Sequence, residues 1–187
     1  MNGETNHRLK LFATNAAGVV DGKLSSLRSE VNETEANIVT IQETHSKQKG
    51  KIQLQDLVSF EAIRKKKGGG TLCAIHKDLS PKLIEEYNNE FEMIVVEVKV
   101  NNKDIRIITG YGPQENMDEE KRMPFFTALE AEIIKAKMAG KSVIVEMDAN
   151  SKLGKEHIEN DPHDISPNGK ILENIIKKQN PKNVKEQ

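Results

Sequence analysis

The chain has 187 residues, and its 28 basic and 29 acidic side chains leave a formal net charge of −1. This near-neutral balance excludes proteins that bind nucleic acid through a uniformly basic body or tail. The length suits one domain with its own core, and 18 Ile and 12 Val against 12 Leu favour β-strands over an all-helical bundle.

The cysteine content and the apolar segments predict the compartment. Cys73 is the lone cysteine and lies in the apolar run 71–75, so no disulfide can form within the chain, as is typical of a reducing environment. The first thirty residues hold no stretch of signal-peptide length, and no run approaches the ~18 apolar residues of a membrane span. We expect an intracellular protein of the nucleus or cytoplasm, neither secreted nor membrane-bound.

The first half of the chain alternates apolar segments with turn signals. Residues 8–14 and 38–41 are typical of strands. Between them, apolar residues recur at helical spacing after Asp21, which is a good N-cap. A strand pair is predicted at 57–63 and 71–76, joined by a basic, glycine-rich turn.

The second half begins with an antiparallel hairpin, predicted from residues 93–100 and 104–109. The strongest helical periodicity of the chain follows at 118–137. A further strand is predicted at 142–147, then a loop, and then a last helix that begins near Asn168.

The order of these elements predicts the fold class. Helices that interleave with both hairpins and single strands indicate an α/β (α+β) fold, in which helices cover a mixed sheet. The sequence has no repeat, no second composition regime and no linker. We therefore expect a single domain over residues 1–187, with a polar tail at 180–187 that frays.

Four of the predicted strands end in groups that can bind metal or phosphate: Asn15, Glu43, Tyr111, and Asp148 with Asn150. Asp148 and Asn150 can point into one pocket, because an extended strand returns to the same face every second residue. A carboxylate beside an amide suits Mg²⁺, which prefers oxygen ligands. Any one of these positions alone is more often a turn residue, but four at the same kind of boundary predict a site.

The motif order resembles that of a known family. Asn15, Gln42-Glu43, Tyr111-Gly-Pro113 and Glu146-Met-Asp-Ala-Asn150 are similar to the motifs of the endonuclease/exonuclease/phosphatase superfamily. With Asn168-Gly169 and the Gly-Gly-Gly turn, the chain resembles especially the apurinic-type endonuclease domain of non-LTR (LINE-like) retrotransposons, over about residues 8–179. The resemblance implies a four-layer sandwich of mixed β-sheets flanked by helices, with the active site at one edge.

The resemblance also implies roles for these residues. Glu43 would bind the catalytic Mg²⁺, or Mn²⁺ in its place. Asn15 would lie beside Glu43 and contact the metal ion or the phosphate. Asp148 would activate the attacking water, Asn150 would position the phosphate and Asp148, and Tyr111 would contact the scissile phosphate. The implied reaction is in-line attack of water on a DNA phosphodiester. In a full-length relative, the implied partner is a downstream reverse transcriptase domain in the same polypeptide.

The chain departs from the family pattern in two places. Where the family usually has glycine before the aspartate motif, this chain has Glu146 and then Met147, a change that we expect to concern packing. The family's later strands and its Ser-Asp-His motif have no counterpart, because nothing after Ile176 is typical of a strand. We expect a C-terminally truncated version of the fold, with unpaired strand edges, an uncovered apolar face and low solubility.

Other histidines are poor candidates to replace the missing one. His157 and His163 lie in the loop after Asp148, where side chains are usually solvated. His45 and His76 follow strands and could line the rim of a pocket, but we expect both to be exposed.

The basic turn has two interpretations. Arg64, Lys65, Lys66 and Lys67 could form a solvated hairpin tip, or they could contact the phosphate backbone of a nucleic acid.

The sequence leaves three functions open for the chain as a whole. The first is a Mg²⁺-dependent DNA-nicking endonuclease, the second is a non-catalytic relic that binds nucleic acid or a partner, and the third is a lipid or inositol phosphate phosphatase of the same superfamily. The basic turn and the retrotransposon-like spacing favour DNA.

Overall fold

The computed structural model describes residues 8–19, 21–64, 68–87, 91–154 and 164–179. Over these residues the chain forms eight strands, three α-helices and one short 3₁₀ turn at Lys77–Leu79. The strands are β1 (Leu11–Asn15), β2 (Ile38–Gln42), β3 (Leu57–Ala62), β4 (Thr71–His76), β5 (Lys82–Tyr87), β6 (Glu92–Val100), β7 (Lys103–Tyr111) and β8 (Ser142–Asp148). The helices are α1 (Asp21–Thr34), α2 (Glu119–Met138) and α3 (Pro167–Gln179).

The strands form two mixed sheets of four. The first sheet has the order β1-β2-β4-β3, and the second has the order β5-β6-β7-β8. Each sheet contains one parallel pair, β1 with β2 and β7 with β8, and all its other pairings are antiparallel. Parallel neighbours end at the same edge of a sheet, so the polar residues after β1 and β2 lie side by side, as do those after β7 and β8.

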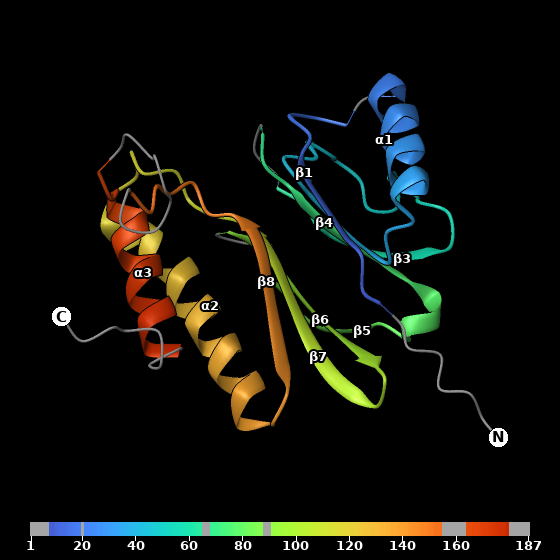
Figure 1. Ribbon diagram of the computed structural model, residues 1–187. Coiled ribbons are helices and arrows are strands. Elements are labelled where there is room, and N and C mark those ends of the chain that lie inside the picture. Colours follow the sequence, from blue (N-terminus) through green and yellow to red (C-terminus); the bar gives the residue numbers. More distant parts are fainter. Residues whose placement is uncertain (1–7, 20, 65–67, 88–90, 155–163, 180–187) are drawn as a thin grey trace.

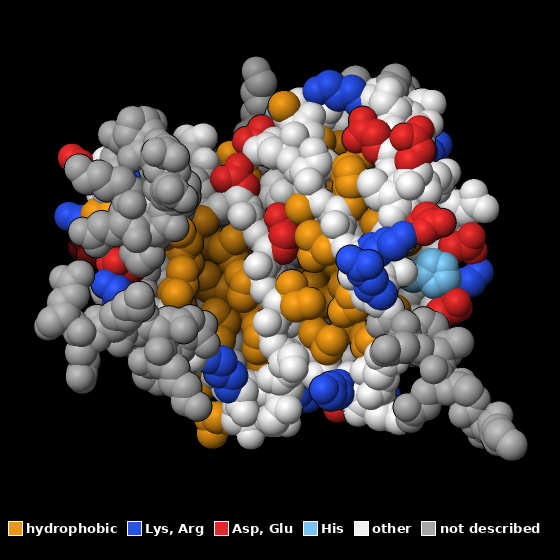
Figure 2. All heavy atoms as spheres, in the orientation of Figure 1, with side chains coloured by type: hydrophobic (Ala, Val, Ile, Leu, Met, Phe, Trp, Pro, Cys, Tyr) orange, Lys and Arg blue, Asp and Glu red, His pale blue; other side chains and the backbone are white. Residues whose placement is uncertain are grey.

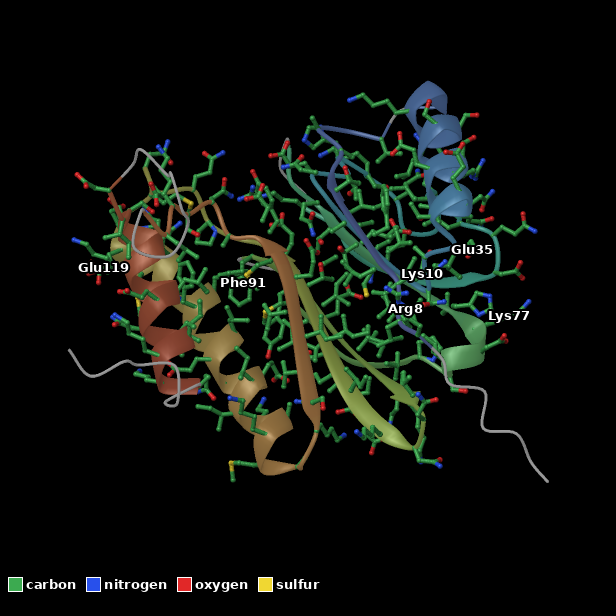
Figure 3. All side chains as sticks on the ribbon, in the orientation of Figure 1. Arg8, Lys10, Glu35, Lys77, Phe91 and Glu119 are labelled. Carbon is green, nitrogen blue, oxygen red and sulfur yellow. The ribbon has the colours of Figure 1, made fainter. Side chains whose placement is uncertain are left out.

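The sheets pack face to face and helices cover their outer faces, with α1 on the first sheet and α2 and α3 on the second (Figure 1). A core cluster that includes Ile75 and Ile107 fills the space between the sheets. A second cluster joins α1 to the first sheet, and a third joins Phe125 of α2 and nearby Phe91 to the second (Figure 3). The predicted four-layer sandwich is therefore confirmed. None of the described helices is both long and apolar enough to cross a membrane.

The sequence predicted every described strand except β5, with shifts of a few residues at the ends. The reason lies in the register of β5 against β6, which shifts between Leu83 and Glu85. A bulge of this kind breaks the alternation of apolar and polar residues. The period-of-two pattern that identifies a strand in a sequence is therefore missing from Lys82–Tyr87.

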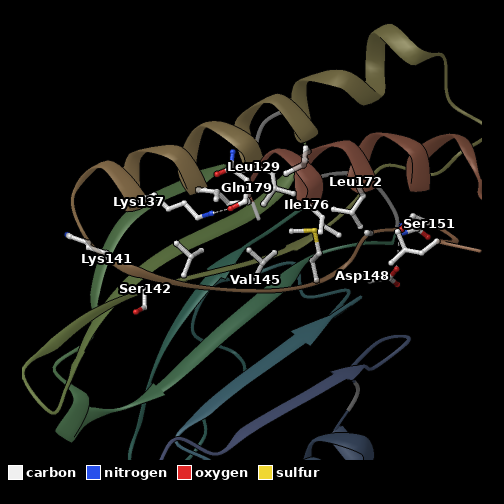
Figure 4. A pocket seen from close by; sticks show the side chains of 17 residues that line it. Leu129, Lys137, Lys141, Ser142, Val145, Asp148, Ser151, Leu172, Ile176 and Gln179 are labelled. Atoms are coloured by element: carbon white, nitrogen blue, oxygen red, sulfur yellow. Dashed lines mark hydrogen bonds between the residues drawn. The ribbon is translucent and has the colours of Figure 1, made fainter. Parts of the chain in front are cut away.

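An apolar groove of about 900 Å³ opens between α3 and β8 (Figures 2 and 4). No described strand pairs with the outer edge of β8. Val145 on that strand is 41% exposed, and Ile176 on α3 is 43% exposed. An unpaired edge beside an apolar surface favours pairing between molecules.

The isolated chain is therefore expected to self-associate through β8, and Val145→Lys is expected to reduce this association. A lysine in the groove would have to lose its hydration when a second edge strand approached. Sedimentation velocity at rising protein concentration measures the effect. Val58→Lys is the matched control. Val58 is also 41% exposed and lies on β3, which is an edge strand of the first sheet. Equal association of both variants and the wild type would contradict the prediction.

Candidate active site

The five residues singled out at strand ends lie together where the two sheets meet. The side-chain amide of Asn15 donates a hydrogen bond from Nδ2 to Asp148 Oδ2 at 2.9 Å. The Tyr111 hydroxyl donates to Glu43 Oε1, also at 2.9 Å. Both bonds run from one sheet to the other, so residues as far apart in sequence as 133 positions form one polar cluster.

The backbone around this cluster adopts unusual conformations. Glu43, His45 and Asn150 have φ values of +51°, +52° and +45°, in the left-handed region that side chains other than glycine rarely adopt. Hydrogen bonds hold this backbone in place, with the Gly18 N–H donating to Glu43 O and the Gly112 N–H donating to Asp148 O, both at 2.7 Å. Strained residues that persist because the surrounding structure holds them are typical of functional sites.

Asp148 is oriented by two donors, one at each carboxylate oxygen. The Asn150 backbone N–H donates to Oδ1 at 3.0 Å, and Asn15 Nδ2 donates to Oδ2. Asn150 is itself held, because its side-chain Nδ2 donates to Gly112 O at 2.8 Å. The sequence argument that Asp148 and Asn150 share one pocket is consistent with this arrangement.

Tyr111 serves as a hydrogen-bond donor in the cluster. Burial raises the pKa of its hydroxyl, and the adjacent Glu43 carboxylate raises it further. The phenol therefore stays protonated at neutral pH. It donates to only one carboxylate oxygen of Glu43, and the other, Oε2, lies 3.7 Å from His45 Nε2, beyond hydrogen-bond distance.

The carboxylate and amide oxygens of this cluster suit Mg²⁺ better than a metal ion that needs a full set of protein ligands. Within the described ranges no group of three or more His, Cys, Asp and Glu side chains gathers around one point. The Glu43 side chain is 25% exposed, and its Oε2 could bind a ligand. The Asn15 and Asn150 amides lie on the Asp148 side of the cluster. One carboxylate with amide oxygens and water suits Mg²⁺, because this ion retains much of its hydration.

The histidines occupy different places. His45 is exposed, as predicted, and its ring stands against Gly18, where a Cβ atom would come within 2.9 Å of Nδ1. His76 is half-buried, not exposed as predicted. It is at the opposite end of its strand from Thr71, beside Asp78, and so lies away from the cluster. His157 and His163 fall outside the described residues.

The basic turn is anchored at its base by a buried acid. Arg64 Nε lies 3.3 Å from Glu92 Oε1, and the Gly70 backbone N–H also donates to this carboxylate. Burial raises the pKa of Glu92, while Arg64 opposes that effect. Glu92 pairs with Tyr111 across the sheet, so the turn begins close to the cluster. Lys65, Lys66 and Lys67 fall outside the described residues, and contact of the turn with nucleic acid stays a prediction.

Asn168 has a structural role that the sequence did not reveal. Its side chain is fully buried, and Nδ2 donates to Pro113 O at 2.8 Å and to Asn150 O at 2.9 Å. Its Oδ1 accepts from Arg122 Nη1 at 2.6 Å. The next residue must be glycine, because a Cβ on Gly169 would lie 2.0 Å from a backbone oxygen. The start of α3 is thus held against the loop that follows Tyr111 and the loop that contains Asn150.

Cys73 and Met147 behave as expected, and Glu146 does not. Cys73 is fully buried, and burial together with the nearby Glu146 raises its pKa to about 12, so it is an inert thiol. Met147 packs in the cluster between the second sheet and its helices. The expectation that Glu146 concerns packing is wrong, because its carboxylate accepts a hydrogen bond from Gln42.

No protein-family model matches the sequence, and a comparison with curated proteins finds no match. Solved structures do match the fold. An AP endonuclease from Leishmania major has a TM-score of 0.74 at 13% identity, over 92% of this chain and 67% of that one. The endonuclease domain of TRAS1, a telomere-specific non-LTR retrotransposon, has a TM-score of 0.63 at 15% identity, over 92% and 71%.

A third match widens the range of chemistry found on this fold. A mannosyl-6-phosphatase from Bacteroides thetaiotaomicron has a TM-score of 0.64 at 10% identity, over 88% of this chain and 70% of that one. The chain thus spans about two thirds of the length of these structures. At such low identities the similarity establishes the fold alone. For the fold, it confirms the resemblance inferred from the motif order.

Proposed function

Because the chain has the fold of the endonuclease/exonuclease/phosphatase superfamily, we propose that it is a Mg²⁺-dependent phosphodiesterase that nicks DNA. One observation carries the proposal. Glu43, Asp148, Asn150, Asn15 and Tyr111 lie in one polar cluster between the two sheets, although they come from four separate strand ends. Asn15 and the Asn150 backbone donate to Asp148, Tyr111 donates to Glu43, and Tyr111 pairs with Asp148 in the register of the second sheet. Fold alone does not establish an activity, so the argument depends on this cluster.

Each member of the cluster has a role that its contacts support. Glu43 would hold Mg²⁺ through Oε2, with Asn15 beside it, and Mn²⁺ could take the same place. When bound, the ion neutralises charge that develops on the phosphate and the leaving oxygen. Tyr111 keeps its proton and fixes the Glu43 carboxylate. Its hydroxyl would also contact the scissile phosphate.

Asp148 is the proposed base. The hydrogen bonds from Asn15 and from the Asn150 backbone hold its carboxylate in one orientation, which a base needs in order to accept a proton from an attacking water. The Asn150 side chain positions the phosphate and, through its link to Gly112 O, keeps its own loop in place. Positioning of this kind supplies a large part of the rate in phosphoryl chemistry.

DNA is the proposed substrate, and the basic turn is the reason for that choice. Arg64 contacts Glu92, which pairs with Tyr111 of the cluster, and we propose that the three lysines that follow Arg64 in sequence meet a phosphate backbone. We further propose that the protein acts in the nucleus or cytoplasm. As in retrotransposon polyproteins, a reverse transcriptase domain would belong to the same polypeptide in a full-length relative.

A phosphatase is the second candidate. The mannosyl-6-phosphatase and the retrotransposon endonuclease match this chain almost equally well, with TM-scores of 0.64 and 0.63. A phosphomonoester has one esterified oxygen where a phosphodiester has two, and hydrolysis of either breaks one P–O ester bond. The same cluster could therefore serve a sugar, lipid or inositol phosphate.

A plasmid assay tests the proposal. Supercoiled plasmid incubated with the protein is expected to become nicked in Mg²⁺ or Mn²⁺ and to stay intact in EDTA. Mannose 6-phosphate, an inositol phosphate and phosphoinositide vesicles are offered in parallel, with phosphate release as the readout. Release from a monoester without nicking would support the phosphatase instead. No turnover of any substrate, with DNA binding retained, would support a non-catalytic relic.

The lysines of the basic turn are expected to set the salt dependence of DNA binding. Changing Lys65, Lys66 and Lys67 together to Ala removes three candidate phosphate contacts. The slope of log K against log salt is then expected to become shallower by about 2 to 3, since each contact contributes roughly 0.9. Fluorescence anisotropy on a labelled duplex measures it. As a control, the lysines at 99, 103 and 121, which are exposed and distant in sequence, are changed to Ala. An unchanged slope in the first variant would exclude the turn from the interface.

A further inference from the structure

Directly behind the catalytic cluster lies a second polar group between the two sheets, made of the buried Gln42 and Thr109 and the half-buried Glu146. Glu146 Oε2 accepts a hydrogen bond from Gln42 Nε2 at 2.8 Å and lies 3.4 Å from Thr109 Oγ1. Gln42 is 2% exposed and Thr109 is fully buried. The three side chains come from β2, β7 and β8, so they connect both sheets.

The position of this trio relates it to the catalytic residues. Gln42 directly precedes Glu43, and Glu146 precedes Asp148 by two residues on the same face of β8. In the register of the second sheet, Thr109 pairs with Glu146 and Tyr111 pairs with Asp148. Each member of the trio therefore lies one or two residues before a member of the catalytic cluster.

The Gln42–Glu146 bond lies on the inner side of the bonds that join the sheets at this end, and Gln42 Nε2 also donates a longer bond, at 3.4 Å, to Thr109 Oγ1. Two outer bonds, Asn15–Asp148 and Tyr111–Glu43, are made by the catalytic residues themselves. Those residues must also be free to bind phosphate and metal. The inner bond involves none of these residues, so it can maintain the separation of the sheets when the outer bonds rearrange.

Packing alone does not explain an acidic residue at this position. Below the trio, the space between the sheets is apolar, with Ile107 and Ile75 in its core cluster. Glu146 lies near the buried Cys73, whose thiol pKa its charge helps to raise. A carboxylate beside apolar groups costs free energy unless hydrogen bonds compensate for it. Here Gln42 and Thr109 supply those bonds.

We infer that Glu146 is a positioning residue: by accepting the hydrogen bond of Gln42, it sets the distance between Glu43 on one sheet and Asp148 on the other. The expected effect of Glu146 on the rate of nicking rests on the proposed function. Its effect on the distance between Glu43 and Asp148 does not depend on any activity. The carboxylate oxygen that accepts the bond is the functional feature, and the charge of Glu146 is secondary.

Two variants of Glu146 separate the hydrogen bond from the charge. Glu146→Met keeps the length of the side chain and removes the acceptor, whereas Glu146→Gln keeps an acceptor oxygen and removes the charge. Tyr87→Phe is the control, because it removes one hydrogen bond to a different carboxylate, that of Glu132, at 3.2 Å. Urea unfolding of all three variants first establishes that each is folded.

Amide hydrogen exchange tests the inference without reference to activity. The Gly18 and Gly112 amides, which bond to Glu43 O and Asp148 O, report on the two sides of the cluster. Their exchange is expected to be about tenfold faster in Glu146→Met and unchanged in Glu146→Gln and Tyr87→Phe. Unchanged exchange in Glu146→Met would overturn the inference, whether or not the wild type nicks DNA.

Kinetics supply the second readout. In Glu146→Met, kcat for nicking is expected to fall about 10- to 100-fold with little change in KM, because misplaced groups slow the reaction more than they weaken binding. Glu146→Gln is expected to stay within about threefold of the wild type, as a retained hydrogen bond predicts. A loss in Glu146→Gln as large as in Glu146→Met would overturn the assignment to the hydrogen bond. A wild type that nicks no DNA would overturn the proposed function, and the exchange result would still decide the role of Glu146.

Discussion

Asp148→Asn is expected to lower Mg²⁺-dependent nicking of plasmid by about 10²- to 10⁴-fold, the range typical for loss of a general base. The amide cannot accept a proton from water, and its NH₂ group would face a donor, either Asn15 Nδ2 or the Asn150 N–H. Glu43→Gln is expected to lower the same rate and to raise the Mg²⁺ concentration needed for half-maximal rate. Single-turnover kinetics across a Mg²⁺ titration measure both effects.

Asp104→Asn is the matched control for this prediction. Asp104 lies near the start of β7, seven residues before Tyr111, and its side chain is exposed. The substitution makes the same chemical change away from the cluster, so the rate is expected to stay at that of the wild type. If Asp148→Asn and Glu43→Gln nick plasmid as fast as this control, the site is wrongly assigned.

Asn168→Ala is expected to lower the free energy of unfolding by roughly 2–4 kcal/mol, because several buried polar groups lose their partners at once. The Arg122 guanidinium, on a residue that is 6% exposed, loses the acceptor at 2.6 Å. The carbonyl oxygens of Pro113 and Asn150 lose their donor. Urea denaturation followed by circular dichroism measures the loss.

Asn174→Ala tests whether this loss is specific to the buried position. Asn174 lies on the same helix with an exposed side chain, so its removal is expected to change the free energy of unfolding by less than about 0.5 kcal/mol. Equal stability of the two variants would show that Asn168 does not hold the loops. Nicking by Asn168→Ala is also expected to fall at temperatures where the variant is folded, because Asn150 loses its support.

Local signals in the chain were sufficient to locate most of the fold and the candidate cluster. Alternation and helical spacing identify seven strands and three helices, because a half-buried strand repeats every second residue and a helix roughly every fourth. Polar residues after apolar runs pointed to Asn15, Glu43, Tyr111, Asp148 and Asn150. These residue types interrupt a hydrophobic pattern, so they are visible in a sequence.

The tertiary structure decided how those residues relate to one another. Asn15 contacts Asp148 only because the two sheets pack face to face. The sequence around either residue gives no signal of a partner 133 positions away. The same holds for Asn168, which in sequence is an ordinary helix start. From the sequence, we expected Glu146 to affect packing alone. In the structure its carboxylate accepts a hydrogen bond from Gln42, 104 residues earlier in the chain.

The sequence by itself thus determined which strands form and which polar groups stand at their ends, since both depend on neighbours a few residues away. It could not determine β5, where a bulge removes the alternation. Nor could it determine which carboxylate lies beside which amide, or that Arg64 meets the buried Glu92. Those contacts depend on sheet order, on register and on the packing of one sheet against the other, which only the folded chain brings about.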